Sequence, residues 1–196
     1  MGMIRIILFP KEDLMPQSAP QPHPSSPLRQ RLAEEPGVVL EQIAHEENIS
    51  LLEVVRCLPQ NHWTEVSGRH YLNVLSALPS WGEVTTVLHT ADVIMEFKGP
   101  FPSGRTGHGF YNLQGKTGLS GHLRPERCQH IVFMERPFMG METASIQFFN
   151  GEGEGIFKVF VGRDEQRQLR QDQLQHFSRL RNTLTALDHV EREASA

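Results

Sequence analysis

The stretch EVTTVLHTADVIMEFKG, residues 83–99, decides the fold class of this chain. It contains two runs of β-branched and apolar residues on either side of a short segment at 90–92. In the second run Val93, Met95 and Phe97 occupy alternate positions, which is the period of a strand with one apolar face. The stretch therefore predicts an antiparallel β-hairpin that turns at residues 90–92.

Further strand candidates surround this hairpin. They are separated by Gly, Pro or Asn residues, which interrupt regular structure. Neighbouring candidates are close enough in the chain to pair as antiparallel strands. The sequence thus predicts one large antiparallel sheet that contains the hairpin at 83–99 and further strands at 63–68, 109–113, 119–123, 128–135, 144–150 and 155–161.

Helices are predicted at both ends of the strand-rich region. Ser26 followed by Pro27 is typical of a helix start, and this helix should run to Glu35. Helical spacing of apolar residues predicts two more helices within 38–58 and a short one at 70–78. Near the C-terminus, Asp164 is a candidate N-cap for an amphipathic helix with Phe177, Leu180, Leu184 and Leu187 on one face. Strands flanked by helices predict an α+β fold.

The length of 196 residues and the hydrophobic content of 38% are sufficient for one domain. Residues 16–27 are rich in Pro, Gln, Ser and His, so we expect 1–25 to be a disordered extension. The domain should span 26–188, with a flexible tail at 189–196. Cys57 and Cys128 form no CxxC motif, which suits a reduced compartment such as the cytoplasm.

The charge distribution argues against a partner that is a nucleic acid or an anionic membrane. The formal net charge is −4 and the pI is about 6.2. Residues 38–58 resemble a helix-turn-helix, yet 26–60 contains three arginines against six glutamates. Because such a surface repels phosphates, we interpret this segment as packed helices and not as a DNA reader.

The tripeptide at 115–117, Gly-Lys-Thr, invites comparison with a nucleotide-binding loop. Such a loop has a glycine five residues before the Gly-Lys pair, but Phe110 occupies that position. Gly118, Gly121 and Pro125 also oppose a helix directly after the tripeptide. We therefore set ATP and GTP binding aside. From Lys98 to Arg136, however, six basic residues stand against two acidic ones, which predicts binding of some anion.

Three histidines, His89, His108 and His122, lie in this strand-rich half. Imidazole binds iron, copper and zinc, and the phenolate of a residue such as Tyr111 binds ferric iron. The spacing alone leaves metal ligation and ordinary solvation both open, since no HxH or HExxH motif is present. No GxSxG motif is present either, and Cys128 has no base assigned to it, so a catalytic triad lacks support.

Five longer blocks resemble the HutX/ChuX family of intracellular haem-utilisation carriers. The resemblance runs from about Pro27 to about Leu187. The blocks are LLEVVRCLP (51–59), WGEVTTVLHTADVIMEFKGPFPSG (81–104), GFYNLQGKTGLSGHLR (109–124), CQHIVFMERPFMGMETASIQFFNGEG (128–153) and FKVFVGRDEQRQL (157–169).

The resemblance implies a cytoplasmic protein that binds haem b without a covalent bond and passes it to a haem-degrading enzyme. It further implies a homodimer, no stable membrane association, and a fold similar to one half of the larger two-repeat haem-handling proteins. The family role is that of a carrier and not of an enzyme. A haem-degrading activity like that of a haem oxygenase is the alternative.

The family's haem-binding histidines lie in its HTAD and SGH blocks, which carry over to His89 and His122. A tyrosine of the glycine-rich block corresponds to Tyr111. Where a relative orders this aromatic pair as Tyr-Phe, the one-residue shift turns the side chain to the other face of the strand. We expect His122 or Tyr111 to ligate the iron and His89 to support the site. Lys116 and Arg124 should bind the propionates. The alternative is that they are exposed charged residues in turns.

Overall fold

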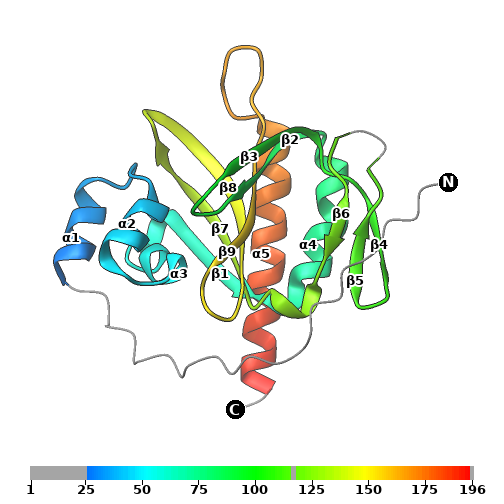
Figure 1. Cartoon of the computed structure of the whole chain (residues 1–196), viewed down its shortest axis with the longest axis horizontal. Coiled ribbons are helices and arrows are strands. Elements are labelled where there is room, and N and C mark those ends of the chain that lie inside the picture. The colour runs from blue at the N-terminus through cyan, green and yellow to red at the C-terminus, as the bar shows by residue number, and fades with distance from the viewer. Residues whose placement is uncertain (1–25, 116–117, 195–196) are drawn as a thin grey trace.

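The computed structural model describes residues 26–115 and 118–194. Within these ranges the protein has an α+β fold of helices and antiparallel sheets (Figure 1). The predicted fold class is therefore confirmed. None of the helices in these ranges is long and apolar enough to cross a membrane.

Six strands form the central antiparallel sheet. They are β1 (Trp63–Ser67), β2 (Glu83–His89), β3 (Ile94–Pro100), β7 (His130–Phe138), β8 (Met141–Phe149) and β9 (Gly155–Phe160). Their spatial order is β1-β7-β8-β9-β2-β3. The predicted hairpin is β2–β3, in which His89 pairs with Ile94 beside the turn. The Thr90 hydroxyl accepts hydrogen bonds from the backbone N–H groups of Asp92 and Val93, which stabilises that turn.

Three shorter strands form a second sheet, where the sequence predicted a single one. They are β4 (Gly104–Gly107), β5 (Phe110–Leu113) and β6 (Gly121–Leu123), in that spatial order. The sequence analysis did not predict β4, because glycines at both its ends leave no alternating apolar pattern. A Cβ atom on Gly104 would lie 2.3 Å from Cε1 of Tyr111. Glycine therefore allows β4 to pack closely over the Tyr111 ring.

Three N-terminal helices pack together as predicted: α1 (Ser26–Glu34), α2 (Leu40–Glu47) and α3 (Leu51–Val55). Asn48, at a φ of 52°, ends α2 in the left-handed conformation. Ser50 and Glu53 form a capping box that starts α3. The helices bury Leu32, Ile43 and other apolar side chains against the sheet.

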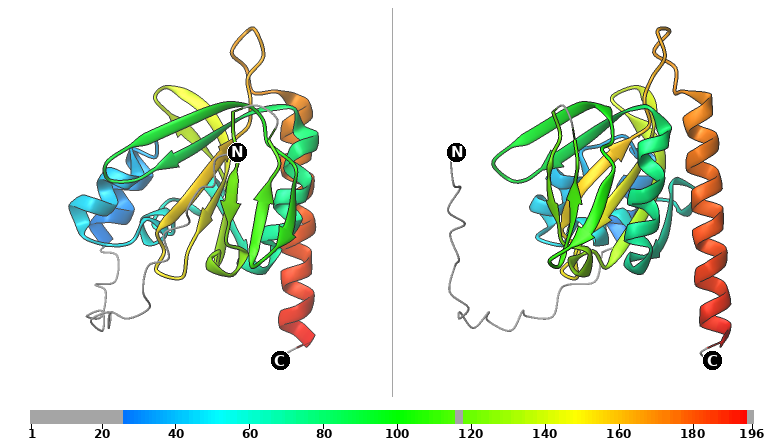
Figure 2. Two further views of the ribbon diagram at one scale, coloured as in Figure 1. Left: turned by 45° about the vertical axis from the view of Figure 1, so that its right-hand side comes forward. Right: turned by 90° about the vertical axis from the view of Figure 1, so that its right-hand side faces the viewer.

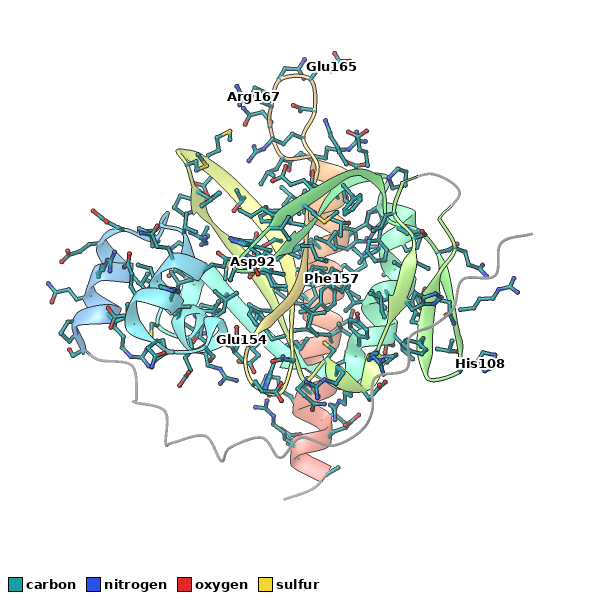
Figure 3. All side chains as sticks on the ribbon, in the orientation of Figure 1. Asp92, His108, Glu154, Phe157, Glu165 and Arg167 are labelled. Carbon is teal, nitrogen blue, oxygen red and sulfur yellow. The ribbon has the colours of Figure 1, made fainter. Side chains whose placement is uncertain are left out.

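Helices α4 (Tyr71–Ala77) and α5 (Gln171–Ala194) cover the other face of the central sheet. On β7, Phe133 packs toward α5, where its ring lies 5.2 Å from that of Phe177. Its neighbours Val132 and Met134 pack toward α1–α3. Figure 2 shows α5 and the N-terminal helices on opposite sides of the sheet, and Figure 3 shows Phe157 among the packed side chains at the centre. Four 3₁₀ turns occur in the described residues: η1 (Gln60–His62), η2 (Gly68–His70), η3 (Leu78–Trp81) and η4 (Pro125–Arg127).

The C-terminal helix differs from its prediction in three ways. Asp164 does not cap α5, because it accepts a hydrogen bond from the N–H of Gln168 before the helix begins. The loop that contains Glu165 and Arg167 protrudes from the molecule (Figure 3). Leu187 is 43% exposed, whereas Asp188 is buried. The helix also continues over 189–194, where we predicted a flexible tail. The extension predicted to be disordered, residues 1–25, lies outside the described residues.

Candidate functional site

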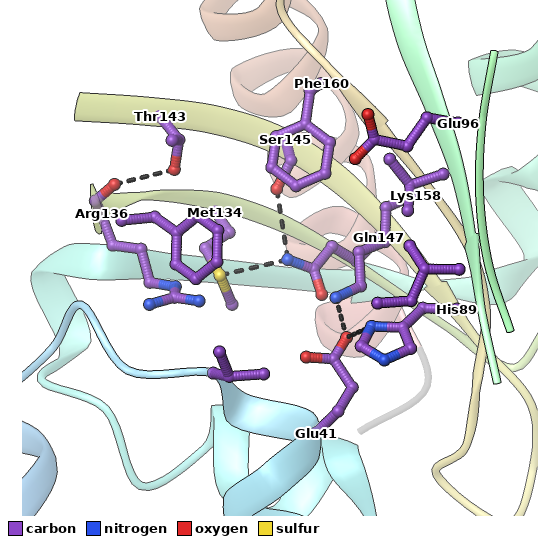
Figure 4. A pocket seen from close by; sticks show the side chains of 14 residues that line it. Glu41, His89, Glu96, Met134, Arg136, Thr143, Ser145, Gln147, Lys158 and Phe160 are labelled. Atoms are coloured by element: carbon purple, nitrogen blue, oxygen red, sulfur yellow. Dashed lines mark hydrogen bonds and ion pairs between the residues drawn. The ribbon is translucent and has the colours of Figure 1, made fainter. Parts of the chain in front are cut away.

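A cavity of about 180 Å³ lies between α2 and the central sheet, on the face that α1–α3 cover only in part (Figure 4). Its apolar lining residues are Val39, Val87, Ile94, Met134, Phe138 and Phe160. Its polar and charged lining residues are Glu41, His89, Glu96, Arg136, Thr143, Ser145, Gln147 and Lys158. Apolar walls that carry a few charged groups are typical of a small-molecule site.

Glu41 connects α2 to the sheet through two side chains. Its Oε1 atom lies 3.2 Å from Nδ1 of His89, at the end of β2. The same carboxylate forms an ion pair with Lys158 on β9. Burial acts to raise the pKa of Glu41, but the charge and hydrogen bond of Lys158, with a smaller effect of His89, hold it below its usual value. The carboxylate is therefore ionised at neutral pH.

Arg136 places a buried cation in the wall of the cavity and is 8% exposed. Its Nη1 atom donates hydrogen bonds to the carbonyl oxygens of Pro36, at 2.6 Å, and Val38, at 3.0 Å. No carboxylate of the described residues forms an ion pair with it, and burial lowers its pKa while Glu41 acts to raise it. Because this buried cation has no direct contact with a carboxylate among the described residues, it is suited to bind an anion.

Gln147 contributes a polar atom that lacks a partner. Its Nε2 atom donates to Ser145 Oγ and Met134 Sδ, both at 3.2 Å. Its Oε1 atom is buried and accepts no hydrogen bond from the residues that the structure describes. Because buried carbonyl groups normally have a donor, this atom is available to a bound molecule.

A second cavity, of about 410 Å³, adjoins the first one. The two share five lining residues: Val87, Glu96, Phe138, Thr143 and Phe160. The second cavity extends over β2, β8 and β9 toward Met141 and Arg163. We call the two cavities together the sheet groove. It runs from His89 at one end to Arg163 at the other.

Comparison with known proteins identifies the family. A family model described as haem utilisation ChuX/HutX matches residues 64–180, which is more than half of the chain. The chain belongs to the ChuX/HutX family. Its relative in Vibrio cholerae, the intracellular heme transport protein HutX, is 39% identical over 149 residues. These residues cover 76% of this chain and 77% of that relative.

Several solved structures share the fold. A protein from Erwinia carotovora is 48% identical with a TM-score of 0.77, and the match covers 80% of this chain and 98% of that one. The heme binding protein ChuX is 48% identical with a TM-score of 0.73, covering 81% and 99%. The heme degrading enzyme ChuS of Escherichia coli O157:H7, 13% identical with a TM-score of 0.65, matches 85% of this chain over 49% of its own length. The expected likeness to one half of a larger haem-handling protein is confirmed.

In this ChuX/HutX protein, the predicted site residues do not all lie together. His122 is exposed on β6, and its Nδ1 atom lies 2.6 Å from Oδ1 of Asn112 on β5. Its ring is 5.8 Å from that of Phe110, over which the Arg124 guanidinium lies at 4.7 Å. We call Phe110, Asn112, His122 and Arg124 the outer cluster. His89 lies on the other sheet, in the sheet groove, so it does not neighbour His122 as predicted.

Tyr111 occupies the opposite face of β5 from the outer cluster. It pairs with Leu123, is 6% exposed and packs in the hydrophobic core with Phe101. The structure therefore places the phenol apart from both histidines, and Phe110 takes the outward position. Lys116, the other predicted propionate partner, lies outside the described residues.

Sequence reasoning missed three polar residues of the sheet groove, Glu41, Gln147 and Lys158, and included Arg136 only as one of the six basic residues from Lys98 to Arg136. Arg136, Gln147 and Lys158 interrupt apolar strands, and a polar residue at an inward position of such a strand is a signal for a buried site. Glu41 gave no comparable signal, since it lies on a helix with several exposed glutamates. Among the described residues, no group of three or more His, Cys, Asp or Glu side chains is arranged to hold a bare metal ion.

Proposed function

We propose that this protein is an intracellular carrier that binds haem b without a covalent bond and delivers it to a haem-degrading enzyme. Two relatives support this proposal: HutX of Vibrio cholerae is named an intracellular heme transport protein, and ChuX a heme binding protein. The observation that carries the proposal is the sheet groove, where His89 and Arg136 line the same cavity.

The residues of the groove match the chemistry of haem. Haem is a flat apolar disc with an iron that accepts a nitrogen ligand and two propionates that need cations. Phe138 and Phe160 provide apolar walls, and His89 provides an imidazole. Arg136 is a buried cation without a carboxylate partner among the described residues, so we assign it to a propionate.

The size of the groove suits a cargo that must be released. The cavity at His89, about 180 Å³, is smaller than the roughly 300 Å³ at which small-molecule pockets usually begin. Together with the adjoining cavity of about 410 Å³ the space becomes adequate. A bound haem would need the space of both cavities, and the residues around His89 and Arg136 would hold it without a covalent bond, which suits release.

The outer cluster is the second part of this proposal. His122 is the alternative axial ligand, and Arg124 beside it is a further propionate partner. Lys116, which lies outside the described residues, remains a predicted propionate partner. Tyr111 supports the cluster from beneath through its packing. We also propose that the protein is a homodimer, which sedimentation velocity of the purified chain will test.

Titration with hemin tests the proposal directly. We expect one hemin per chain and a Soret band that depends on His89 or His122. The matched control is His176→Ala, which removes an exposed histidine of α5 that stacks on Trp81 and lines neither cavity of the groove. A protein that binds no hemin, or binds it equally well in all three alanine variants, would contradict the proposal.

The same complex separates a carrier from an enzyme. With ascorbate as reductant and oxygen present, a carrier should keep a stable Soret band. A haem-degrading enzyme would lose this band over repeated turnovers, and absorption of an open-chain tetrapyrrole would appear. Turnover at more than one haem per chain would replace the carrier role with the enzymatic one.

A further inference from the structure

One nitrogen of the His89 ring lies next to a carboxylate. Oε1 of Glu41 lies 3.2 Å from Nδ1 of His89, and the two side chains are only 20% and 21% exposed. A neutral imidazole has one N–H and one lone pair. Because the ionised carboxylate lies beside Nδ1, its negative charge favours the form with the proton on that nitrogen and the lone pair on Nε2.

The backbone alone does not determine where that lone pair points. His89 ends β2 and pairs with Ile94, and the Thr90 turn follows directly, so its main chain is well fixed. The ring can still rotate about its side-chain bonds. Among the described residues, the polar group that contacts this ring is the carboxylate of Glu41. The orientation of the imidazole therefore depends on that carboxylate.

Glu41 is itself held from two sides. It belongs to the first turn of α2, whose Leu40 and Ile43 are buried against the sheet. Its carboxylate forms an ion pair with Lys158 on β9 (Figure 4). A carboxylate held in this way can keep an imidazole in one orientation, as carboxylates do behind histidine ligands in many metal proteins.

The two histidines that we propose as iron ligands differ in the group that lies beside Nδ1. Nδ1 of His122 meets the neutral amide oxygen of Asn112, at 2.6 Å. A carboxylate polarises the N–H more strongly than an amide does and makes the opposite nitrogen a stronger donor. On the basis of the charge beside its Nδ1 atom, we expect His89 to be the stronger axial ligand.

We infer that Glu41 is a positioning residue for haem: it holds the His89 ring with Nε2 available to the iron and strengthens that nitrogen as a donor, and Lys158 keeps Glu41 in place. The inference rests on the proposed function, because it takes His89 as an iron ligand. It assigns Glu41 a role through His89 and no contact with the iron itself.

The variant Glu41→Gln tests this role, because glutamine keeps the size and the acceptor but removes the charge. We expect hemin to bind about 10-fold more weakly, as is typical when the partner of a ligating histidine is changed. The iron–imidazole stretching frequency of the ferrous complex should fall and the reduction potential should rise. Glu41→Asp, which restores the charge, should return both signals toward the wild-type values.

The matched control is Glu46→Gln on the same helix. Glu46 also forms an ion pair, with Arg31 at 3.3 Å, but lines neither cavity of the groove. This variant should leave hemin affinity, stretching frequency and potential unchanged. Thermal unfolding of the haem-free proteins will establish that each variant is folded.

A double-mutant cycle with His89→Ala completes the test. In that background Glu41→Gln should have no further effect on the haem spectrum, because the ring on which it acts is gone. If His89→Ala changes the spectrum and Glu41→Gln does not, the role of Glu41 is overturned and the carrier function stands. If His89→Ala itself changes nothing in a haem-loaded protein, the inference is overturned as well. Wild-type protein that takes up no hemin overturns the proposed function itself.

Discussion

Arg136 and Phe138 lie on the same face of β7, and the guanidinium carbon of Arg136 is 5.2 Å from the centre of the Phe138 ring. Both residues line the cavity that contains His89. The Nη1 atom of Arg136 is already bound to the carbonyl oxygens of Pro36 and Val38, which fixes the plane of the guanidinium before any ligand arrives. A fixed cation beside an aromatic wall suits a ligand that is both flat and acidic.

Arg136→Met should weaken hemin binding by about 10- to 100-fold, because a hydrogen bond between charged groups contributes roughly 1.5–3 kcal/mol. Hemin dimethyl ester, which lacks the carboxylates, should lose much less affinity from the same change. Absorbance titration of both compounds gives the comparison. Arg127→Met, which removes an exposed arginine paired with Glu152, is the control. Equal weakening for acid and ester would show that Arg136 acts through packing alone.

The proposed ligands predict a distinct order of effects on the haem spectrum. His89→Ala should produce the largest change in Soret position and intensity, and His122→Ala a smaller one. Tyr111→Phe should leave the spectrum unaltered, because the phenol lies in the core on the face opposite to the outer cluster. Loss of a charge-transfer band in Tyr111→Phe would instead identify a tyrosinate ligand and show that the smaller sheet opens.

Asp188 predicts a pH dependence of stability. It accepts a hydrogen bond from the N–H of Ser67, at 2.8 Å, and lies 3.0 Å from Nε2 of His70. Burial acts to raise the pKa of Asp188, but these hydrogen bonds and the charges of His70 and Arg69 hold it below its usual value. A carboxyl whose pKa is lower in the folded than in the unfolded state stabilises the fold above its unfolded pKa, about 3.9. This contribution is lost as the pH falls through the folded pKa.

Asp188→Asn should therefore lower the free energy of unfolding at pH 7 by about 2 kcal/mol, the typical contribution of a hydrogen bond to a charged group. The difference from wild type should shrink at pH values below about 4. Urea denaturation of wild type and variant, at pH 7 and at a pH below about 4, measures this difference in the free energy of unfolding. The control is Asp172→Asn, which removes an exposed carboxylate of the same helix that pairs with Arg170; it should change stability much less. A difference for Asp188→Asn that persists undiminished at low pH would contradict the assignment.

Two glycines of the smaller sheet should respond differently to alanine. At Gly104 a Cβ atom would lie 2.3 Å from Cε1 of Tyr111 and 2.8 Å from the carbonyl oxygen of Asn112, whereas at Gly121 no atom lies within 4 Å. Gly104→Ala should lower the free energy of unfolding by about 1–3 kcal/mol, because the strand must move to relieve the clash. Gly121→Ala should be nearly neutral. Thermal and urea unfolding of the two variants will test this contrast.

The parts of the fold that were predictable depend on local patterns. The hairpin at 83–99 follows from alternation within a few residues, and the helices follow from apolar spacing and from signals such as Ser50 before Glu53. Strand β4 was missed because the glycine at its start, Gly104, is required by the ring of Tyr111 on the next strand, which is a tertiary reason. The continuation of α5 beyond residue 188 was missed because Asp188 is retained inside by partners 118 to 121 positions away.

The candidate site was predictable only in part for a similar reason. His89, His122 and Arg124 belong to blocks that resemble the family, whereas Glu41, Arg136 and Lys158 meet His89 only once α2, β7 and β9 are packed. No spacing within one segment shows that these groups share a cavity. For Tyr111 the resemblance identified the block, but the face of the strand is determined by a register that the sequence leaves open.

Glu41 belongs to a helix and His89 to a strand, and the two elements meet here through side chains alone. On the proposed role, the affinity for haem therefore depends on how tightly α2 packs on the sheet. An acceptor protein that moves this helix away from the sheet by the length of one side chain would weaken haem binding without contacting the haem. Recognition of the acceptor and release of haem would then be a single step.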